Sequence, residues 1–95
     1  MDGHKCVRVI ITGIVQGVGF RWRGRQTAMA LEVRGWIRNR PDGSVEAVLQ
    51  GPSDLVDEML DWISKGPHGA VVRGITTSPC DADPDLSDFL SLGSG

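Results

Sequence analysis

The spacing of apolar residues in the first third of the chain predicts a strand followed by a helix. Residues 7–12 (VRVIIT) are β-branched and roughly alternate, which is typical of a buried strand. After a glycine-rich loop, Phe20, Gly24, Ala28 and Leu31 recur at spacings of four, four and three residues, which places them on one helix face. Gly24 costs such a helix about 1 kcal/mol relative to alanine, so we expect close packing against a sheet there.

The middle of the chain has the pattern of a β-hairpin. Residues 33–39 are apolar enough for a second strand, and residues 44–50 alternate as a third. Between them, residues 40–43 (RPDG) form a turn signal, because proline presets φ and the Asp-Gly pair suits a tight reversal.

A second helix and up to two more strands complete the pattern. Ser53 is expected to cap this helix, and Gly66-Pro67 ends it. Its apolar stripe consists of Leu55, Val56, Met59, Leu60 and Ile63. A strand is predicted over about 70–77, an acidic loop over 79–85, and a short final strand within 86–92.

The order β-α-β-β-α-β predicts an α+β fold, a ferredoxin-like split βαβ sandwich with an antiparallel sheet and both helices on one face. Strands one and three are then central, and strand two lies at an edge beside strand three. Ninety-five residues fit one domain, 1–95, with a core of about 5–78 and a tail, 79–95, whose course the pattern leaves open.

Composition argues against several classes of protein. The net charge of −2 does not indicate a general affinity for nucleic acid or for a membrane surface. No apolar run approaches the ~20 residues that span a bilayer, and the N-terminus lacks the order of a secretory signal. We therefore expect a cytoplasmic monomer. Cys6 and Cys80 are expected as reduced thiols, although antiparallel pairing of strands one and four would bring them close enough for a disulfide.

The loop at residues 13–19 is the first candidate for chemistry. Three glycines in seven residues let backbone N–H groups turn inward, and the following helix start adds unpaired N–H groups, an arrangement that suits phosphate. The alternative is a loop that is glycine-rich for steric reasons alone. It is neither a Walker loop nor a full GxGxxG dinucleotide motif.

Two polar side chains could complete an anion site with this loop. Arg21 has a fixed fork that grips two phosphate oxygens, and a cation in a first helical turn is disfavoured unless an anion binds there. Arg23 and Arg25 are expected to be surface charges. Asn39 ends the second strand, and its amide could reach a water near the phosphate, although asparagine near a turn is often only structural.

Residues 13–21 (GIVQGVGFR) resemble the acylphosphatase signature G-x-V-Q-G-V-x-F-R at every defined position. The resemblance covers roughly residues 7–78 and continues through Ala28, Leu31, Gly35-Trp36-Ile37, Asn39, Asp42-Gly43, Val45-Glu46, Gln50-Gly51, Trp62, Gly66-Pro67, Ala70 and Val72. The chain thus resembles a stand-alone acylphosphatase. One departure is Glu32, which stands where the family usually has glycine; in a left-handed helix cap it costs about 1 kcal/mol.

The resemblance implies a complete reaction. In that family the loop amides and the motif arginine cradle a phosphate, and the motif asparagine, here Asn39, orients the attacking water. Acyl phosphates are hydrolysed to a carboxylate and inorganic phosphate, without a metal or other cofactor. The implied partners are an acyl phosphate and inorganic phosphate or another anion, with no nucleic acid and no membrane. The residues implied in phosphate binding are Val15, Gln16, Gly17, Val18, Gly19, Phe20 and Arg21.

The chain offers no clear nucleophile–base pair, since His4 is expected in a mobile terminus and His68 in a loop. Positioning and charge stabilisation can supply most of the catalysis of phosphoryl transfer, so a nucleophile–base pair is not needed.

Three alternatives remain open at this point. A similar domain opens hydrogenase-maturation carbamoyltransferases, whose substrate would be carbamoyl phosphate, but such domains tend to have proline where this chain has Trp22. An RNA-binding sheet is disfavoured because Phe20, Trp36 and Trp62 fit core positions, which leaves no aromatic platform. A family member that binds phosphate without turnover is the third alternative.

Overall fold

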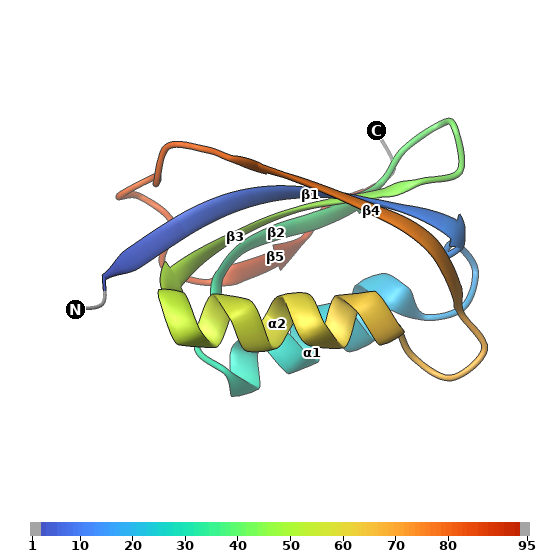
Figure 1. The fold of residues 1–95 in the computed structure, drawn as a ribbon, viewed down its shortest axis with the longest axis horizontal. Helices are drawn as coiled ribbons and strands as arrows, with labels where there is room; N and C mark the ends of the chain where they lie inside the picture. The colour runs from blue at the N-terminus through green and yellow to red at the C-terminus, as the bar shows by residue number, and fades with distance from the viewer. Residues whose placement is uncertain (1–2, 94–95) are drawn as a thin grey trace.

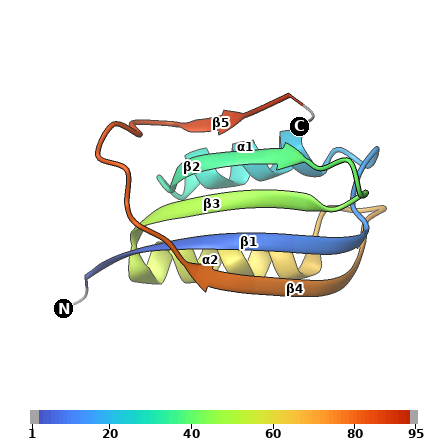
Figure 2. The same cartoon turned by 90° about the horizontal axis from the view of Figure 1, so that it is seen from above.

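The computed structural model describes residues 3–93. Within them the elements follow the order β1 (His4–Ile14), α1 (Phe20–Ala30), β2 (Arg34–Asn39), β3 (Val45–Pro52), α2 (Ser53–Lys65), β4 (Val71–Pro79) and β5 (Phe89–Ser91) (Figure 1). The strands form one sheet in the order β4-β1-β3-β2-β5 (Figure 2). Neither helix in the described part of the chain is long and apolar enough to cross a membrane.

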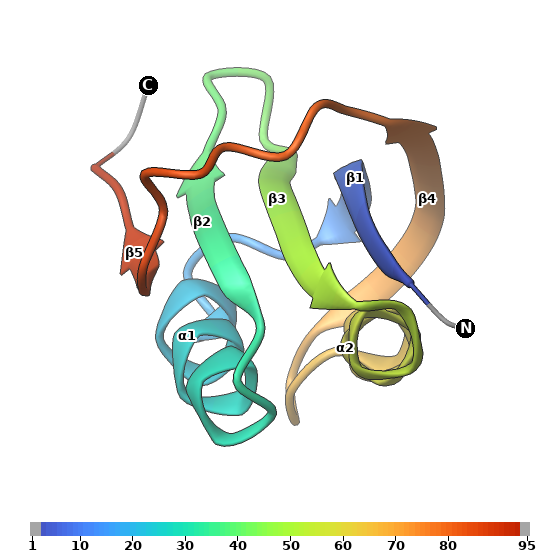
Figure 3. The same ribbon diagram turned by 90° about the vertical axis from the view of Figure 1, so that its left-hand side faces the viewer.

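The ferredoxin-like α+β fold is confirmed, with one correction to the sheet. The pairs β1–β3, β1–β4 and β2–β3 are antiparallel, with β1 and β3 at the centre, and both helices cover the same face (Figure 3). The short final strand β5 pairs with β2 in parallel, so the sheet is mixed. The prediction that strand two is an edge strand was therefore wrong, because the C-terminal segment returns to cover it.

The core lies between this sheet and the two helices. Gly24 packs as predicted: a Cβ there would lie 3.1 Å from Ile37 Cδ1 and 3.7 Å from the ring of Trp62. Phe20 is buried, and its ring meets that of Trp62 edge to face with centroids 5.5 Å apart. Close approach of α1 to the sheet thus fixes the first turn of the helix, which follows the glycine-rich loop.

Trp36 is not a core residue, which corrects the sequence prediction. Its neighbour Ile37 is fully buried under α1, so the alternation of the strand turns Trp36 to the helix-free face of the sheet. There it is half-buried, and the guanidinium of Arg38 lies over its ring, 5.5 Å from the centroid.

On the same open face, Glu46 of β3 joins the two strands that flank it. Its carboxylate, 3% exposed, accepts hydrogen bonds from Arg8 of β1 and from Arg38 of β2, the latter at 2.7 Å. Burial raises the pKa of Glu46, but the hydrogen bonds and charges of Arg38 and Arg8 outweigh it and hold the pKa below its ordinary value. The pair of arginines therefore stabilises the ionised carboxylate.

The helix ends differ from the predicted ones in one place. Ser53 is the first residue of α2 rather than its cap, and its hydroxyl donates to the carbonyl of Gly3 instead of capping the helix. At the end of α1, Glu32 adopts the left-handed conformation with φ 59°. Its N–H donates to Met29, and the N–H of Val33 donates to Ala28, the two bonds of a Schellman cap that favours glycine at this position.

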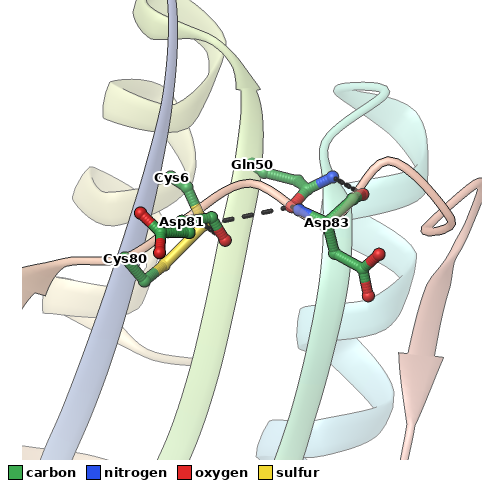
Figure 4. Close-up of a disulfide and its surroundings, with 5 residues drawn as sticks. All are labelled: Cys6, Gln50, Cys80, Asp81 and Asp83. Carbon is green, nitrogen blue, oxygen red and sulfur yellow. Dashed lines mark hydrogen bonds between the residues drawn. A yellow bond between two sulfur atoms is a disulfide. The ribbon is translucent and has the colours of Figure 1, made fainter.

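Cys6 at the start of β1 and Cys80 after β4 form a disulfide, which corrects the prediction of two reduced thiols (Figure 4). Antiparallel pairing of β1 with β4 brings their Cα atoms to 5.3 Å. Next to the disulfide, Gln50 and Asp83 exchange two hydrogen bonds, of 2.8 and 2.9 Å.

His4 also belongs to β1 and pairs with Pro52, so the prediction of a mobile terminus at His4 was wrong.

Candidate active site

A pocket of about 280 Å³ opens at the end of the sheet opposite the disulfide. The loop after β1, the first turns of α1, the end of β2 and the end of β5 meet there (Figure 2). Its lining residues are Val15, Gly17, Gly19, Phe20, Arg21, Trp22, Arg25, Asn39 and Ser91. The pocket therefore combines residues from three separate parts of the sequence: residues 15–25, Asn39 and Ser91.

The loop beside this pocket contains backbone donors without a partner in the described part of the chain. Gly17 and Gly19 have φ of 75° and 77°, a region that glycine enters without strain. Gly19 is also the N-cap of α1 and supplies no side-chain cap. Within residues 3–93, the N–H groups of residues 16–20 make no hydrogen bond to another part of the chain. A run of such N–H groups at a helix start attracts an anion.

Two residues of the motif shape the loop instead of lining the pocket. The side-chain amide of Gln16 donates to the carbonyls of Arg40 and Ser44, at 2.7 and 2.8 Å, and so braces the loop against the β2–β3 turn. Val18 is partly buried against the core. The turn is held in addition by Asp42, which accepts hydrogen bonds from the hydroxyl and the N–H of Ser44; these bonds lower the pKa of Asp42.

Arg21 and Asn39 meet in the pocket although they come from α1 and β2. Arg21 is half-buried, and its Nη1 donates to the carbonyl of Leu92 at 2.7 Å, which leaves its other N–H groups available to a ligand. Within residues 3–93 no carboxylate forms a salt bridge with Arg21. Among the described residues the site thus holds an arginine without a counter-ion, a loop of N–H groups without partners, and an amide that can orient a water.

The acylphosphatase family model matches residues 7–90, which is most of the chain. This chain belongs to the acylphosphatase family. An acylphosphatase of Bordetella parapertussis is 49% identical over 92 residues, covering 96% of this chain and 98% of the relative. The structure of an acylphosphatase from Coxiella burnetii, 34% identical, superposes with a TM-score of 0.88 and covers 94% of this chain and 93% of that one. The chain is accordingly placed among the small hydrolases of this family.

Full-length HypF, whose structure is described as phosphate- and nucleotide-bound, has the same fold with a TM-score of 0.88. The identity is 24%, and this acylphosphatase-family chain covers 12% of HypF, so the likeness extends to the fold alone.

Sequence reasoning missed three lining residues of the acylphosphatase pocket. Arg25 was expected to be a surface charge, yet it is half-buried and lines the pocket. Its spacing of four from Arg21 was the available signal, because such residues share a helix face. Trp22, 62% exposed, and Ser91 line the mouth as well. Arg23 is exposed, as predicted, and is not among the residues that line this pocket; its guanidinium lies 5.7 Å from the ring centroid of Trp22.

Proposed function

We propose that this chain hydrolyses acyl phosphates, with the phosphate held by the loop amides and Arg21 and the attacking water oriented by Asn39. The observation that carries the proposal is that Arg21 and Asn39 line one pocket together with Gly17, Gly19 and Phe20, in a loop whose N–H groups at residues 16–20 have no partner within residues 3–93. The family relationship supports the same activity.

The reaction follows from charge and position. The oxygen of water bonds to phosphorus, and the bond between phosphorus and the bridging oxygen breaks. The bonding electrons leave on the carboxylate, while both water protons remain on the released phosphate. The carboxylate is a good leaving group, so the protein mainly has to align the water and stabilise the equatorial oxygens. The loop N–H groups and the Arg21 guanidinium stabilise the equatorial phosphate oxygens, and the Asn39 side-chain amide orients the attacking water.

Arg21 is positioned for this role by the C-terminal segment. The carbonyl of Leu92 accepts from its Nη1, and the N–H of Leu92 donates to the carbonyl of Ile37 in β2 at 2.9 Å. The strand that carries Asn39 and the segment that holds Arg21 are therefore joined directly. This link fixes the water-orienting residue and the phosphate-binding residue with respect to each other.

Hydrolysis of benzoyl phosphate in the presence of a chelator tests the proposal. We expect turnover by the wild type, a loss of about 10³-fold in kcat/KM for Arg21→Ala, and a loss of about 10²-fold or more for Asn39→Ala. Arg23→Ala is the matched control, because it removes the same charge from the same helix turn outside the pocket. Thermal unfolding of each variant checks that it is folded.

The outcomes separate the alternatives. A folded wild type that turns over no acyl phosphate, but whose melting temperature rises with inorganic phosphate, is a phosphate-binding module and contradicts the proposal. Turnover that requires a metal contradicts the metal-independent mechanism. Equal losses in Arg23→Ala and Arg21→Ala would show that net charge, rather than Arg21 itself, matters.

Two further predictions accompany the function. We propose that the protein acts as a monomer in the cytoplasm, which gel filtration and cell fractionation test.

We also propose that RNA is not a ligand, because the ring of Trp36 is already covered by Arg38 and the charges of Arg8 and Arg38 are compensated by Glu46. Salt-dependent binding of single-stranded RNA would contradict this.

A further inference from the structure

The pocket contains a second arginine that the proposed phosphate site does not use. Arg25 lies one helical turn after Arg21 and lines the same cavity. In the part of the chain that the structure describes, neither arginine forms a salt bridge. Two like charges four residues apart on a helix repel each other. The arrangement is therefore mildly unfavourable for the empty protein and favourable once anions occupy the pocket.

The C-terminal segment holds Arg25 much as it holds Arg21. The Nε of Arg25 donates to the carbonyl of Phe89 at 3.1 Å, and Arg21 donates to the carbonyl of Leu92, three residues further on. This bond uses only the Nε–H group of the Arg25 guanidinium. Its two terminal nitrogens make no hydrogen bond to another residue within 3–93, so they are the donors available at the cavity.

One phosphate does not require both arginines. The loop amides and Arg21 already provide donors around the three terminal oxygens of a phosphoryl group. Arg25 lies one helical turn further from the loop than Arg21, and it lines the same pocket as Ser91, whose neighbours in the tail bond to the two arginines. An acyl phosphate whose phosphorus sits at the loop can extend its acyl portion along this cavity toward Arg25.

We propose that Arg25, together with Ser91 of the same pocket, forms a subsite for an acyl portion that carries its own negative charge, such as a carboxylate. The substrate class is then an acyl phosphate with a second anionic group. The proposal rests on the proposed function and adds to it the recognition of the acyl portion, which leaves as the carboxylate product. The guanidinium contributes charge-assisted hydrogen bonds, and the hydroxyl of Ser91 is a further donor at the same wall.

Matched aryl substrates test this. 4-Carboxybenzoyl phosphate and its neutral isostere 4-carbamoylbenzoyl phosphate differ in charge and little in shape. The corresponding 3-substituted pair places the second group closer to the phosphate. For the wild type we expect kcat/KM to be about tenfold higher for the carboxylate at one of the two ring positions, given a half-exposed arginine. We expect that preference to shrink with added salt.

Variants assign the preference to a residue. Arg25→Gln should bring the ratio of the two kcat/KM values to about one, and Arg25→Lys should retain part of it, because lysine keeps the charge without the fork. Arg23→Gln is the control and should leave the ratio at the wild-type value. The ratio is the informative quantity, since loss of a merely structural contact lowers both values together.

Several results would overturn the subsite. A wild type that hydrolyses both members of each pair equally well has no such subsite, while the proposed function still stands. A ratio that keeps its wild-type value in folded Arg25→Gln shows that Arg25 does not recognise the acyl carboxylate. If kcat/KM falls equally for both substrates in that variant, Arg25 acts in phosphate binding or in folding. A wild type that hydrolyses none of the four compounds, nor benzoyl phosphate, overturns the proposed function together with the subsite.

Discussion

The two ends of the sheet differ in how completely their polar groups are paired. At the end with the disulfide, Cys6 and Cys80 are covalently joined and Gln50 exchanges two hydrogen bonds with Asp83. At the opposite end, successive N–H groups of the loop lack a partner within residues 3–93, and two arginines line a cavity without a carboxylate.

This difference is informative because an unpaired polar group costs free energy that a ligand can recover. The disulfide end stabilises the fold, and the pocket end keeps its hydrogen-bonding capacity for an anion. The C-terminal segment connects the two: it leaves the disulfide end at Cys80, passes Gln50, and supplies at the pocket end the carbonyls that hold Arg21 and Arg25 (Figures 2 and 4). Because the disulfide and the pocket lie at opposite ends of the sheet, changes at the disulfide end should mainly affect stability, and changes at the pocket end should mainly affect turnover.

The largest effect is expected from removal of the disulfide. Cys6→Ser with Cys80→Ser should lower the free energy of unfolding by about 4 kcal/mol, because the bond closes a loop with a sequence separation of 74 residues. We expect kcat/KM for benzoyl phosphate to stay within about twofold of wild type, since the pocket is at the other end. Urea unfolding and steady-state kinetics measure both. Two free thiols on unreduced wild type, or a parallel loss of activity, would contradict the comparison.

Loss of the buried carboxylate on the open face comes next. Glu46→Gln should cost about 2 kcal/mol at neutral pH, because hydrogen bonds from two half-exposed arginines to an ionised group are weakened. The folded pKa of Glu46 lies below its ordinary value of 4.5, so its stabilisation is present above that pH and is lost as the pH falls through the folded pKa. Urea unfolding at about pH 7, 5 and 3 should show the variant and the wild type converging in acid. A constant difference would refute the role of the ionised form.

A methyl group in the loop separates the pocket from the neighbouring β2–β3 turn at the same end of the sheet. Gly19→Ala and Gly43→Ala both force alanine to positive φ, and a Cβ at either position meets no other atom within 4 Å. Each should cost about 1 kcal/mol of stability. Only Gly19 lines the pocket, so Gly19→Ala should also lower kcat/KM by about tenfold or more, by displacing the phosphate. Equal activity in the two variants would argue against the loop as the phosphate site.

The smallest effect is expected at the end of α1. Glu32→Gly should raise the free energy of unfolding by about 1 kcal/mol, because glycine adopts the left-handed cap conformation without strain. Glu58→Gly, within α2, is the opposite control and should lower stability by about the same amount. Urea unfolding of both variants measures the difference. A loss of stability in Glu32→Gly would show that the Glu32 side chain contributes more than its strained backbone costs.

Local patterns in the sequence predicted most of the elements and the position of the pocket. Periods of two and of about 3.6 residues are local, so strands β1 to β4, both helices and the Gly24 contact followed from them. The motif at residues 13–21 likewise predicted a loop of free amides followed by Arg21. Trp36 was misplaced because aromatic character was taken as a sign of burial, whereas its position in the strand alternation faces it away from the helices.

The sequence by itself determined the elements, their order and the chemistry of the motif, since these depend on neighbours within a turn or a strand. The tertiary structure decided where the tail runs. Its parallel pairing with β2, the disulfide to β1, and the carbonyls that position Arg21 and Arg25 all join residues more than fifty positions apart. Such contacts leave no periodic signal in the chain. The spacing of Arg21 and Arg25 places them on one helix face, and the packed fold decides that this face meets the tail and lines the pocket.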